Sequence, residues 1–340
     1  MLSKLIAALI LCFAASVLAG QASPIPQANL RFSNLGSSVG LFPLATNNDS
    51  TVGELCCQSA ADPNALKTVG FLLNPQGWFP QFLTTLPSGG SSSFTSGINA
   101  SGSAAVGGYC VIDCASFVSQ HGFILTLDYG DEYFGFSQID FPGAYATMAG
   151  GVNSSSSVVG TFCLNSTCYF QAPDHGFAYV KGVFTEIKFP GAAATGVFGV
   201  NDAGDMVGGY GLSTPAARLP GDSTSNPASR APSRAASPTP INPNGVPVYG
   251  FLLSGGIFTS FNPPGSIATY PAAINNSGMI VGTFIDAANH QHGFLYKGGK
   301  FQEIDHPNAI LTTADGINDK NQVVGTYETS DGFVSGYIAQ

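Results

Sequence analysis

The sequence predicts an all-β protein: a six-bladed β-propeller of four-stranded blades whose last blade is closed by both termini. Three observations lead to this prediction. A unit of roughly 40–55 residues recurs along the chain. Each unit is rich in Phe, Tyr, Ile, Val and Thr between turn residues, which is the composition of short strands. Outside the first segment, no stretch sustains the 3.6-residue period of an amphipathic helix.

The first segment, residues 1–22, has the features of a secretory signal peptide. Lys4 precedes an apolar run from Leu5 to Leu18, and small residues mark two possible cleavage sites, after residue 19 or after residue 22. The run is shorter than the ~20 residues that span a bilayer, and no second run of that length follows. We therefore expect a secreted protein without a membrane span, in which residues 23–340 form a single propeller domain.

The repeat is visible as whole segments and as two short anchors. Residues 175–210 recur as 249–284 and 292–327, and looser copies occupy 69–109 and 121–162. One anchor is a Gly-Phe pair, which begins at Gly70, Gly122, Gly176, Gly250, Gly293 and Gly332. The other is a Val-Gly pair, which ends at Gly53, Gly107, Gly160, Gly208, Gly282 and Gly325.

Each unit is predicted to contain four short strands. In the copy at 292–327 these are GFLY, KFQEID, TTADGIN and QVVGTY. A tight turn separates the third strand from the fourth, and reads Asn-Asp-Ala-Gly at 201–204 and Asn-Asn-Ser-Gly at 275–278. Asn and Gly tolerate the positive φ that such turns require. Four-stranded repeats of this length are typical of propeller blades.

The two ends of the chain are predicted to share the sixth blade. Residues 28–55 align with the last three strands of a unit, and residues 331–340 supply only a first strand. Without the signal and one insertion, about 47 residues remain for each of six units. Closure of this kind removes the exposed edges of an open array. The alternatives are an open β-solenoid, whose ends would need capping units, and a propeller with five or seven blades.

The repeat resembles the HAF family of extracellular repeat proteins. That family's unit runs from His-Ala-Phe through a Gly turn and an Ala-Gly-Ile-Asn segment to Val-Val-Gly. Here His-Gly-Phe stands at 121–123, 175–177 and 292–294, Gly-Ile-Asn at 97–99 and 316–318, and Val-Val-Gly at 158–160 and 323–325. Gly replaces the middle Ala in these copies. The resemblance implies export and a repeat architecture, and it implies no catalytic residue.

Residues 211–248 interrupt the repeat with a segment rich in Pro, Ser and Ala that contains no aromatic residue. Such a segment cannot bury enough apolar surface to offset the entropy lost on ordering. We predict a disordered insertion within the propeller domain.

Six cysteines remain once Cys12 leaves with the signal, and an even number in an exported chain predicts disulfides. Proximity favours Cys110–Cys114 and Cys163–Cys168, which leaves the adjacent Cys56 and Cys57, whose pairing the sequence leaves open. The cysteine spacings differ from those of zinc sites. We therefore predict no metal site and no cofactor.

Three histidines are the binding candidates. His121, His175 and His292 begin Gly-Phe strands at equivalent positions, so a propeller would place them on one rim. They could serve there as ligands or general bases, or bond to backbone at blade junctions. They belong to three different units, so they cannot all meet at one metal ion.

Candidate carboxylates for a propeller hydrolase are Asp140, Glu186, Glu303 and Asp305. Three of them occupy nearly the same strand of the repeat, so no acid–base pair stands out, and the common hydrolase and nucleotide motifs are absent from the sequence. We predict no catalytic residue.

The net charge of −9 argues against nucleic acid as a partner, because phosphate binding needs a basic face. The predicted function is a secreted, non-enzymatic, monomeric propeller that binds or scaffolds an extracellular glycan or protein. The alternatives are an extracellular hydrolase acting on polysaccharide and a cell-surface structural repeat without a discrete ligand.

Overall fold

The computed structural model describes residues 27–28, 30–34, 41–47, 50–57, 67–73, 81–82, 92–113, 118–127, 134–164, 175–212 and 248–340. The predicted signal peptide lies outside these residues, and so does the insertion except for its ends. Gly211 and Val248, the first and last residues of the predicted insertion, each belong to a strand. The described elements are all β-strands, which confirms the predicted all-β class.

Four sheets follow the chain in order, each with four antiparallel strands. Their strands are β2 (Leu41–Thr46), β3 (Thr51–Cys57), β4 (Lys67–Leu73) and β5 (Gln81–Phe82); β6 (Ser92–Ile98), β7 (Ala104–Asp113), β8 (Val118–Leu127) and β9 (Phe134–Ile139); β10 (Ala146–Val152), β11 (Val158–Cys163), β12 (His175–Val180) and β13 (Val183–Ile187); and β14 (Ala194–Val200), β15 (Met206–Gly211), β16 (Val248–Ser254) and β17 (Ile257–Phe261).

The remaining strands form a nine-stranded sheet that consists of one group of four strands and one of five. One group is β18 (Ser266–Ile274), β19 (Ile280–Asp286), β20 (Gln291–Lys297) and β21 (Lys300–Ile304). The other is β22 (Ala309–Thr312), β23 (Gly316–Ile317), β24 (Val323–Thr329), β25 (Val334–Ala339) and β1 (Phe32–Asn34). One parallel bridge, between Gln291 and Leu311, joins the two groups.

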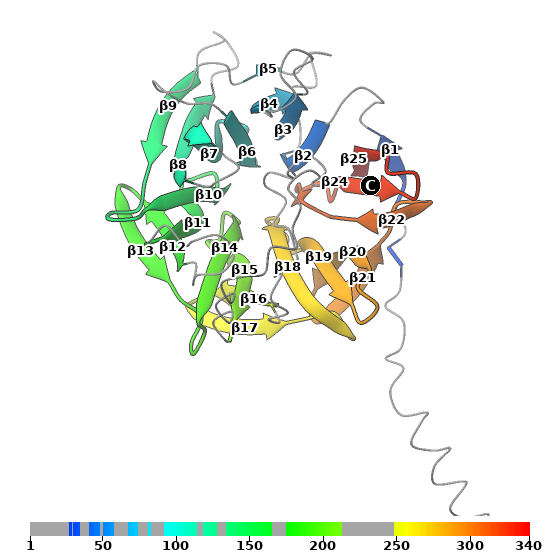
Figure 1. Cartoon of the computed structure of the whole chain (residues 1–340). Helices are drawn as coiled ribbons and strands as arrows, with labels where there is room; N and C mark the ends of the chain where they lie inside the picture. The colour runs from blue at the N-terminus through cyan, green and yellow to red at the C-terminus, as the bar shows by residue number, and fades with distance from the viewer. Residues whose placement is uncertain are drawn as a thin grey trace, which may run out of the picture.

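The groups stand side by side around a common centre, as Figure 1 shows. The innermost strand of each group is the first one, except that β23 takes this place in the last group. These innermost strands contact one another in the order β2, β6, β10, β14, β18, β23 and back to β2. This closed order is the architecture of a β-propeller, and each four-stranded group is a blade. An open solenoid would leave its first and last units apart.

Closure uses both termini, as predicted, but the strands divide differently. The N-terminal strand β1 pairs antiparallel with the C-terminal β25, with Phe32 opposite Ala339 and Asn34 opposite Tyr337. Three inner positions of this blade come from the C-terminal end and only the outermost strand from the N-terminal end. The prediction of one C-terminal and three N-terminal strands was wrong, because a blade begins at the third strand of the sequence unit.

The Val-Gly anchor marks where the second strand of a blade passes beneath an aromatic ring of the third. Gly208 lies opposite Val197 on one side and Phe251 on the other, and a β-bulge at Val197/Gly199 brings the inner strand close. A Cβ atom at Gly208 would lie 1.9 Å from the carbonyl oxygen of Gly196. Only glycine fits there. The rings that cover the equivalent positions are fully buried: Phe123, Phe177, Phe251, Phe294 and Tyr337.

The last unit departs from the predicted anchor. Gly325 pairs with Tyr337, as Gly282 pairs with Phe294 in the preceding blade, so Gly336-Tyr337 takes the place of the Gly-Phe pair. Gly332 instead occupies a turn with φ of 82°, and Phe333 is 42% exposed.

Candidate functional site

The turn between the first and second strands of each blade carries an asparagine, and these asparagines form a closed hydrogen-bonded ring. Each Nδ2 donates to the backbone oxygen of the equivalent asparagine in the next blade. The series is Asn47 to Asn99 (3.2 Å), Asn99 to Asn153 (3.4 Å), Asn153 to Asn201 (3.1 Å), Asn201 to Asn275 (3.3 Å), Asn275 to Asn318 (3.0 Å) and Asn318 to Asn47 (3.0 Å).

The asparagines of the ring are buried, and their side chains form hydrogen bonds with other groups of the protein. The Oδ1 of Asn201 accepts from the N–H of Asp205 at 2.9 Å, which also shapes the turn, and Gly204 takes the positive φ predicted for it. A cavity of about 50 Å³ lies beside the ring. The sequence places glycosylation sequons at Asn99, Asn153 and Asn275, but burial of these side chains closes them to modification in the folded protein.

The predicted histidines lie on the opposite face of the propeller. The second strand of a blade starts at the asparagine turn and runs for about 20 Å before the third strand begins with the histidine. Each histidine Nδ1 contacts a carboxylate that lies in the neighbouring fourth strand or directly after it: His121–Asp140 at 2.8 Å, His175–Glu186 at 2.8 Å and His292–Asp305 at 3.0 Å. The expected backbone partners at blade junctions are thus replaced by side-chain carboxylates within the same blade.

The histidine rings also stack on an aromatic residue of the second strand. Tyr109 packs on His121, Phe162 on His175 and Phe284 on His292, with ring centroids 5.0–5.2 Å apart. The three histidines therefore repeat one local arrangement in three blades and do not converge. The same position holds Tyr249 in the β14–β17 blade and Ser335 in the last one.

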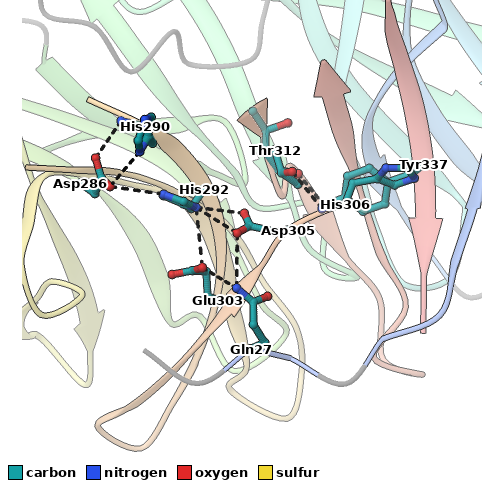
Figure 2. Close-up of polar contacts among 10 residues, drawn as sticks. Gln27, Asp286, His290, His292, Glu303, Asp305, His306, Thr312 and Tyr337 are labelled. Atoms are coloured by element: carbon teal, nitrogen blue, oxygen red, sulfur yellow. Dashed lines mark hydrogen bonds and ion pairs between the residues drawn. The ribbon is translucent and has the colours of Figure 1, made fainter. Parts of the chain in front are cut away.

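Around His292 the arrangement is larger than in the sibling blades (Figure 2). Glu303 lies two residues before Asp305 on β21, with its Oε1 3.7 Å from the Nδ1 of His292. Gln27, from the N-terminal segment, donates to Glu303 and, at 3.3 Å, to Asp305. Residues from opposite ends of the chain thus meet at this cluster.

The electrostatics of the cluster follow from partial burial and close charges. Burial, with the neighbouring Asp305, raises the pKa of Glu303 to about 7. The hydrogen bond to Asp305 raises the pKa of His292. Burial alone would raise the pKa of Asp305, but its hydrogen bonds with His292 and Glu303 outweigh that effect and lower it.

A second set of donors lies on the other side of the His292 ring. The short turn after β19 places Asp286 and His290 there: Asp286 Oδ2 is 3.7 Å from His292 Nε2 and 3.3 Å from His290 Nδ1. Neither Asp286 nor His290 was predicted from the sequence to belong to a site. The signal was present as the spacing Asp-x3-His-x-His.

The structure describes only one cysteine of each predicted spaced pair. Cys110 is buried within β7, and Cys163 is buried at the end of β11. Their predicted partners, Cys114 and Cys168, lie outside the described residues, as do the side chains of Cys56 and Cys57. The proposed pairings stay predictions.

Comparisons with known proteins support the fold. No family model matches the chain, so the resemblance to the HAF family has no support from that source, and no curated protein matches it. Among solved structures, the β-propeller domain of the Trilobed protease from Pyrococcus furiosus, which has an open velcro topology, is similar over 88% of this chain and 95% of that chain, with 8% identity and a TM-score of 0.46.

Two further structures are similar. Trypanosoma rangeli sialidase in complex with 2,3-difluorosialic acid matches over 93% of this chain and 59% of that chain, with 8% identity and a TM-score of 0.50. TolB from Acinetobacter baumannii matches over 86% and 64%, with 9% identity and a TM-score of 0.48. This chain thus spans less than two thirds of the sialidase and TolB chains. At such identities the likeness concerns the fold alone. No helix in the described part of the chain is long and apolar enough to cross a membrane.

Proposed function

We propose that the protein is exported and acts as a non-enzymatic, monomeric binding or scaffold propeller, which engages a glycan or protein outside the cell. One observation carries the non-enzymatic part. Of the four carboxylates that a hydrolase could use, Asp140, Glu186 and Asp305 each contact a histidine of their own blade. A hydrolytic site would instead gather its acid and base about one substrate.

The binding surface is assigned to the face that carries the histidines. There the blades differ from one another, whereas the asparagine face repeats the same contact in every blade. Residues exposed on a rigid scaffold and varied between repeats are the ones free to make contacts with a ligand.

One observation favours the alternative, a hydrolase of polysaccharide. Glu303 and Asp305 present carboxylate oxygens within 4.8 Å of each other, beside His292. Retaining glycosidases hold their two carboxyl groups about 5 Å apart. If catalysis occurs, this pair is the place for it, with Glu303 as the acid and Asp305 as the nucleophile.

A glycan array run in parallel with a broad glycosidase screen separates the two functions. We expect selective retention of a ligand by the purified chain without turnover, and unchanged retention in Glu303→Gln when the ligand binds elsewhere on the face. Glu186→Gln is the matched control, since Glu186 pairs with a histidine in a sibling blade. Turnover that Glu303→Gln abolishes and Glu186→Gln preserves would establish the hydrolase instead.

Export and disulfide formation are tested on the secreted chain itself. N-terminal sequencing should begin after residue 19 or residue 22. Peptide mapping without reduction should recover Cys110 joined to Cys114 and Cys163 joined to Cys168. An uncleaved N-terminus, or both thiols of a pair recovered free, would contradict the corresponding proposal.

A further inference from the structure

The turn Asp286–His290 and the strand that follows it present three metal-type donors to one point. These donors are Asp286 Oδ2, His290 Nδ1 and His292 Nε2, which all lie within 4.8 Å of one another. Figure 2 shows both imidazoles beside the carboxylate of Asp286. The turn is closed by a hydrogen bond from the N–H of Asp286 to the oxygen of His290, and Asn289 takes a φ of 66°.

The carboxylate of Asp286 is held in one orientation. Its Oδ1 accepts the backbone N–H groups of Ala288 at 2.9 Å and His290 at 2.7 Å. Its Oδ2 is left facing the two histidines. A carboxylate whose one oxygen is fixed by backbone donors presents the other oxygen at a defined place, which is what a first ligand to an ion requires.

The ring of His292 is oriented too. Its Nδ1 contacts Asp305 at 3.0 Å, and its face stacks on Phe284. The Nε2 atom is therefore the one that points to Asp286 and His290. A carboxylate behind the distal nitrogen is the usual support of a metal-binding histidine, since it sets both the tautomer and the angle of the ring.

The distances suit an ion better than direct hydrogen bonds. Ligands placed tetrahedrally at about 2.0–2.2 Å from zinc are themselves about 3.3–3.6 Å apart. Asp286 Oδ2 lies 3.3 Å from His290 Nδ1 and 3.7 Å from His292 Nε2. On the other side of His292, the 3.0 Å contact with Asp305 is a hydrogen-bond distance, so that side supports the site and does not form it.

We propose that Asp286, His290 and His292 bind one divalent transition-metal ion of the zinc class, with Asp305 as the positioning residue behind His292. Three protein ligands leave a fourth position for water or for a donor atom of a bound molecule. His290 is 67% exposed along its side chain, so that position opens to solvent. The site does not depend on whether the protein binds or hydrolyses its ligand.

The sibling blades supply an internal comparison. His121 and His175 also have a carboxylate partner and an aromatic support; the partner of His121, Asp140, is equivalent to Asp305. At the position of Asp286, however, they have Val111 and Leu164, and at the position of His290 they have Ser119 and Pro173. The repeat thus provides the supporting pair in three blades, and the two additional donors occur together in one.

The test is a zinc titration of the full exported chain after chelation, followed by calorimetry or equilibrium dialysis. We expect one saturable equivalent of Zn²⁺, and a cobalt(II) complex whose visible absorption is typical of low coordination number. His290→Ala and Asp286→Asn should each lower the affinity at least tenfold. Asp305→Asn should lower it about tenfold, the effect typical of a residue that supports a metal ligand.

Two controls keep the outcome interpretable. Asp140→Asn removes the equivalent carboxylate beside His121 and should leave zinc affinity unchanged. Thermal unfolding of each metal-free variant reports whether it folds, and zinc should raise the melting temperature of the parent chain but not that of His290→Ala. Absence of a saturable equivalent in the folded parent, or equal affinity in the parent and a folded His290→Ala variant, would overturn the site.

Discussion

The two faces of this propeller are built from the same repeat and yet follow opposite rules. On one face, an asparagine occupies the same turn in every blade and bonds to the asparagine of the next, so the contact is uniform around the ring. On the other face, the position that begins the third strand holds histidine in three blades, and Tyr249 or Ser335 in others.

The difference follows from what each face must do for the fold. A buried amide that accepts and donates between blades cannot change in one blade without leaving its neighbour unpaired. A partly buried histidine paired within its own blade can change without consequence for the next blade. Uniformity therefore marks the face that joins neighbouring blades, and variation marks the face to which the proposed binding is assigned.

Among substitutions at positions that repeat in every blade, we expect the largest loss of stability at the Val-Gly anchor. Gly208→Ala places a Cβ 1.9 Å from the oxygen of Gly196 and 2.8 Å from the ring of Phe251, and neither backbone nor buried ring can move freely. We expect a loss of about 3 kcal/mol in the free energy of unfolding, at the upper end for over-packing. Urea denaturation measures it.

The control for that substitution is a glycine with open space. Gly204 has a φ of 82° and nothing within 4 Å of a Cβ, and asparagine tolerates that conformation, so Gly204→Asn should cost less than about 1 kcal/mol. Equal stability of the two variants would contradict this prediction, since it would mean that β14 and β15 can move apart at Gly208 at little cost in free energy.

A smaller effect is expected from opening the asparagine ring. Asn201→Ala removes the donor to Asn275 and the acceptor of the Asp205 N–H, both in a buried place, and should cost about 2 kcal/mol. Ala203→Ser, two residues further along and exposed, should cost less than about 0.5 kcal/mol. A ring variant as stable as its exposed neighbour would show that the blades hold together without these bonds.

Local patterns in the sequence were enough to predict the uniform part. The asparagine turns and the Val-Gly pairs occur at regular intervals, and each is explained by a local need: a positive φ in the turn and close approach of two strands. The all-β class and the use of both termini in one blade followed from the same regularity.

The predictions that were wrong concern features that depend on pairing between distant residues. Gly332-Phe333 and Gly336-Tyr337 both present glycine before an aromatic ring, and only the register with β24 decides that Tyr337 is the buried one. For the same reason, the partner of each histidine lies on a neighbouring strand, where the carboxylate can come from the Asp140 position or from the Glu186 position.

Part of the donor set around His292 could have been predicted from residue spacing. Glu303 and Asp305 alternate by two on a strand, which places them on one face, and Asp286 and His290 are four residues apart in a turn. What the sequence could not provide is the knowledge that this turn is short and folds Asp286 back toward His292.

The smallest effect expected is at the closure of the ring, where a histidine stands in for a phenylalanine. His306 stacks on Tyr327 with centroids 3.6 Å apart, as Phe141 stacks on Phe162 and Phe189 on Tyr210 at the same distance, and it meets the N-terminal Phe32 edge-on. Burial lowers the pKa of His306 below its usual value of 6.5.

A histidine whose pKa is lower in the folded state contributes stability that is complete above the unfolded value, near 6.5, and is lost as the pH falls below it. His306→Phe should therefore match the parent at about pH 8 and exceed it at about pH 5.5, by less than about 1 kcal/mol because the ring is only half-buried. Phe189→His should introduce the same acid sensitivity elsewhere in the propeller, because Phe189 stacks on Tyr210 as His306 stacks on Tyr327. The free energy of unfolding is measured by urea denaturation at each pH. The same pH dependence in the parent and in His306→Phe would show that protonation of His306 does not affect stability.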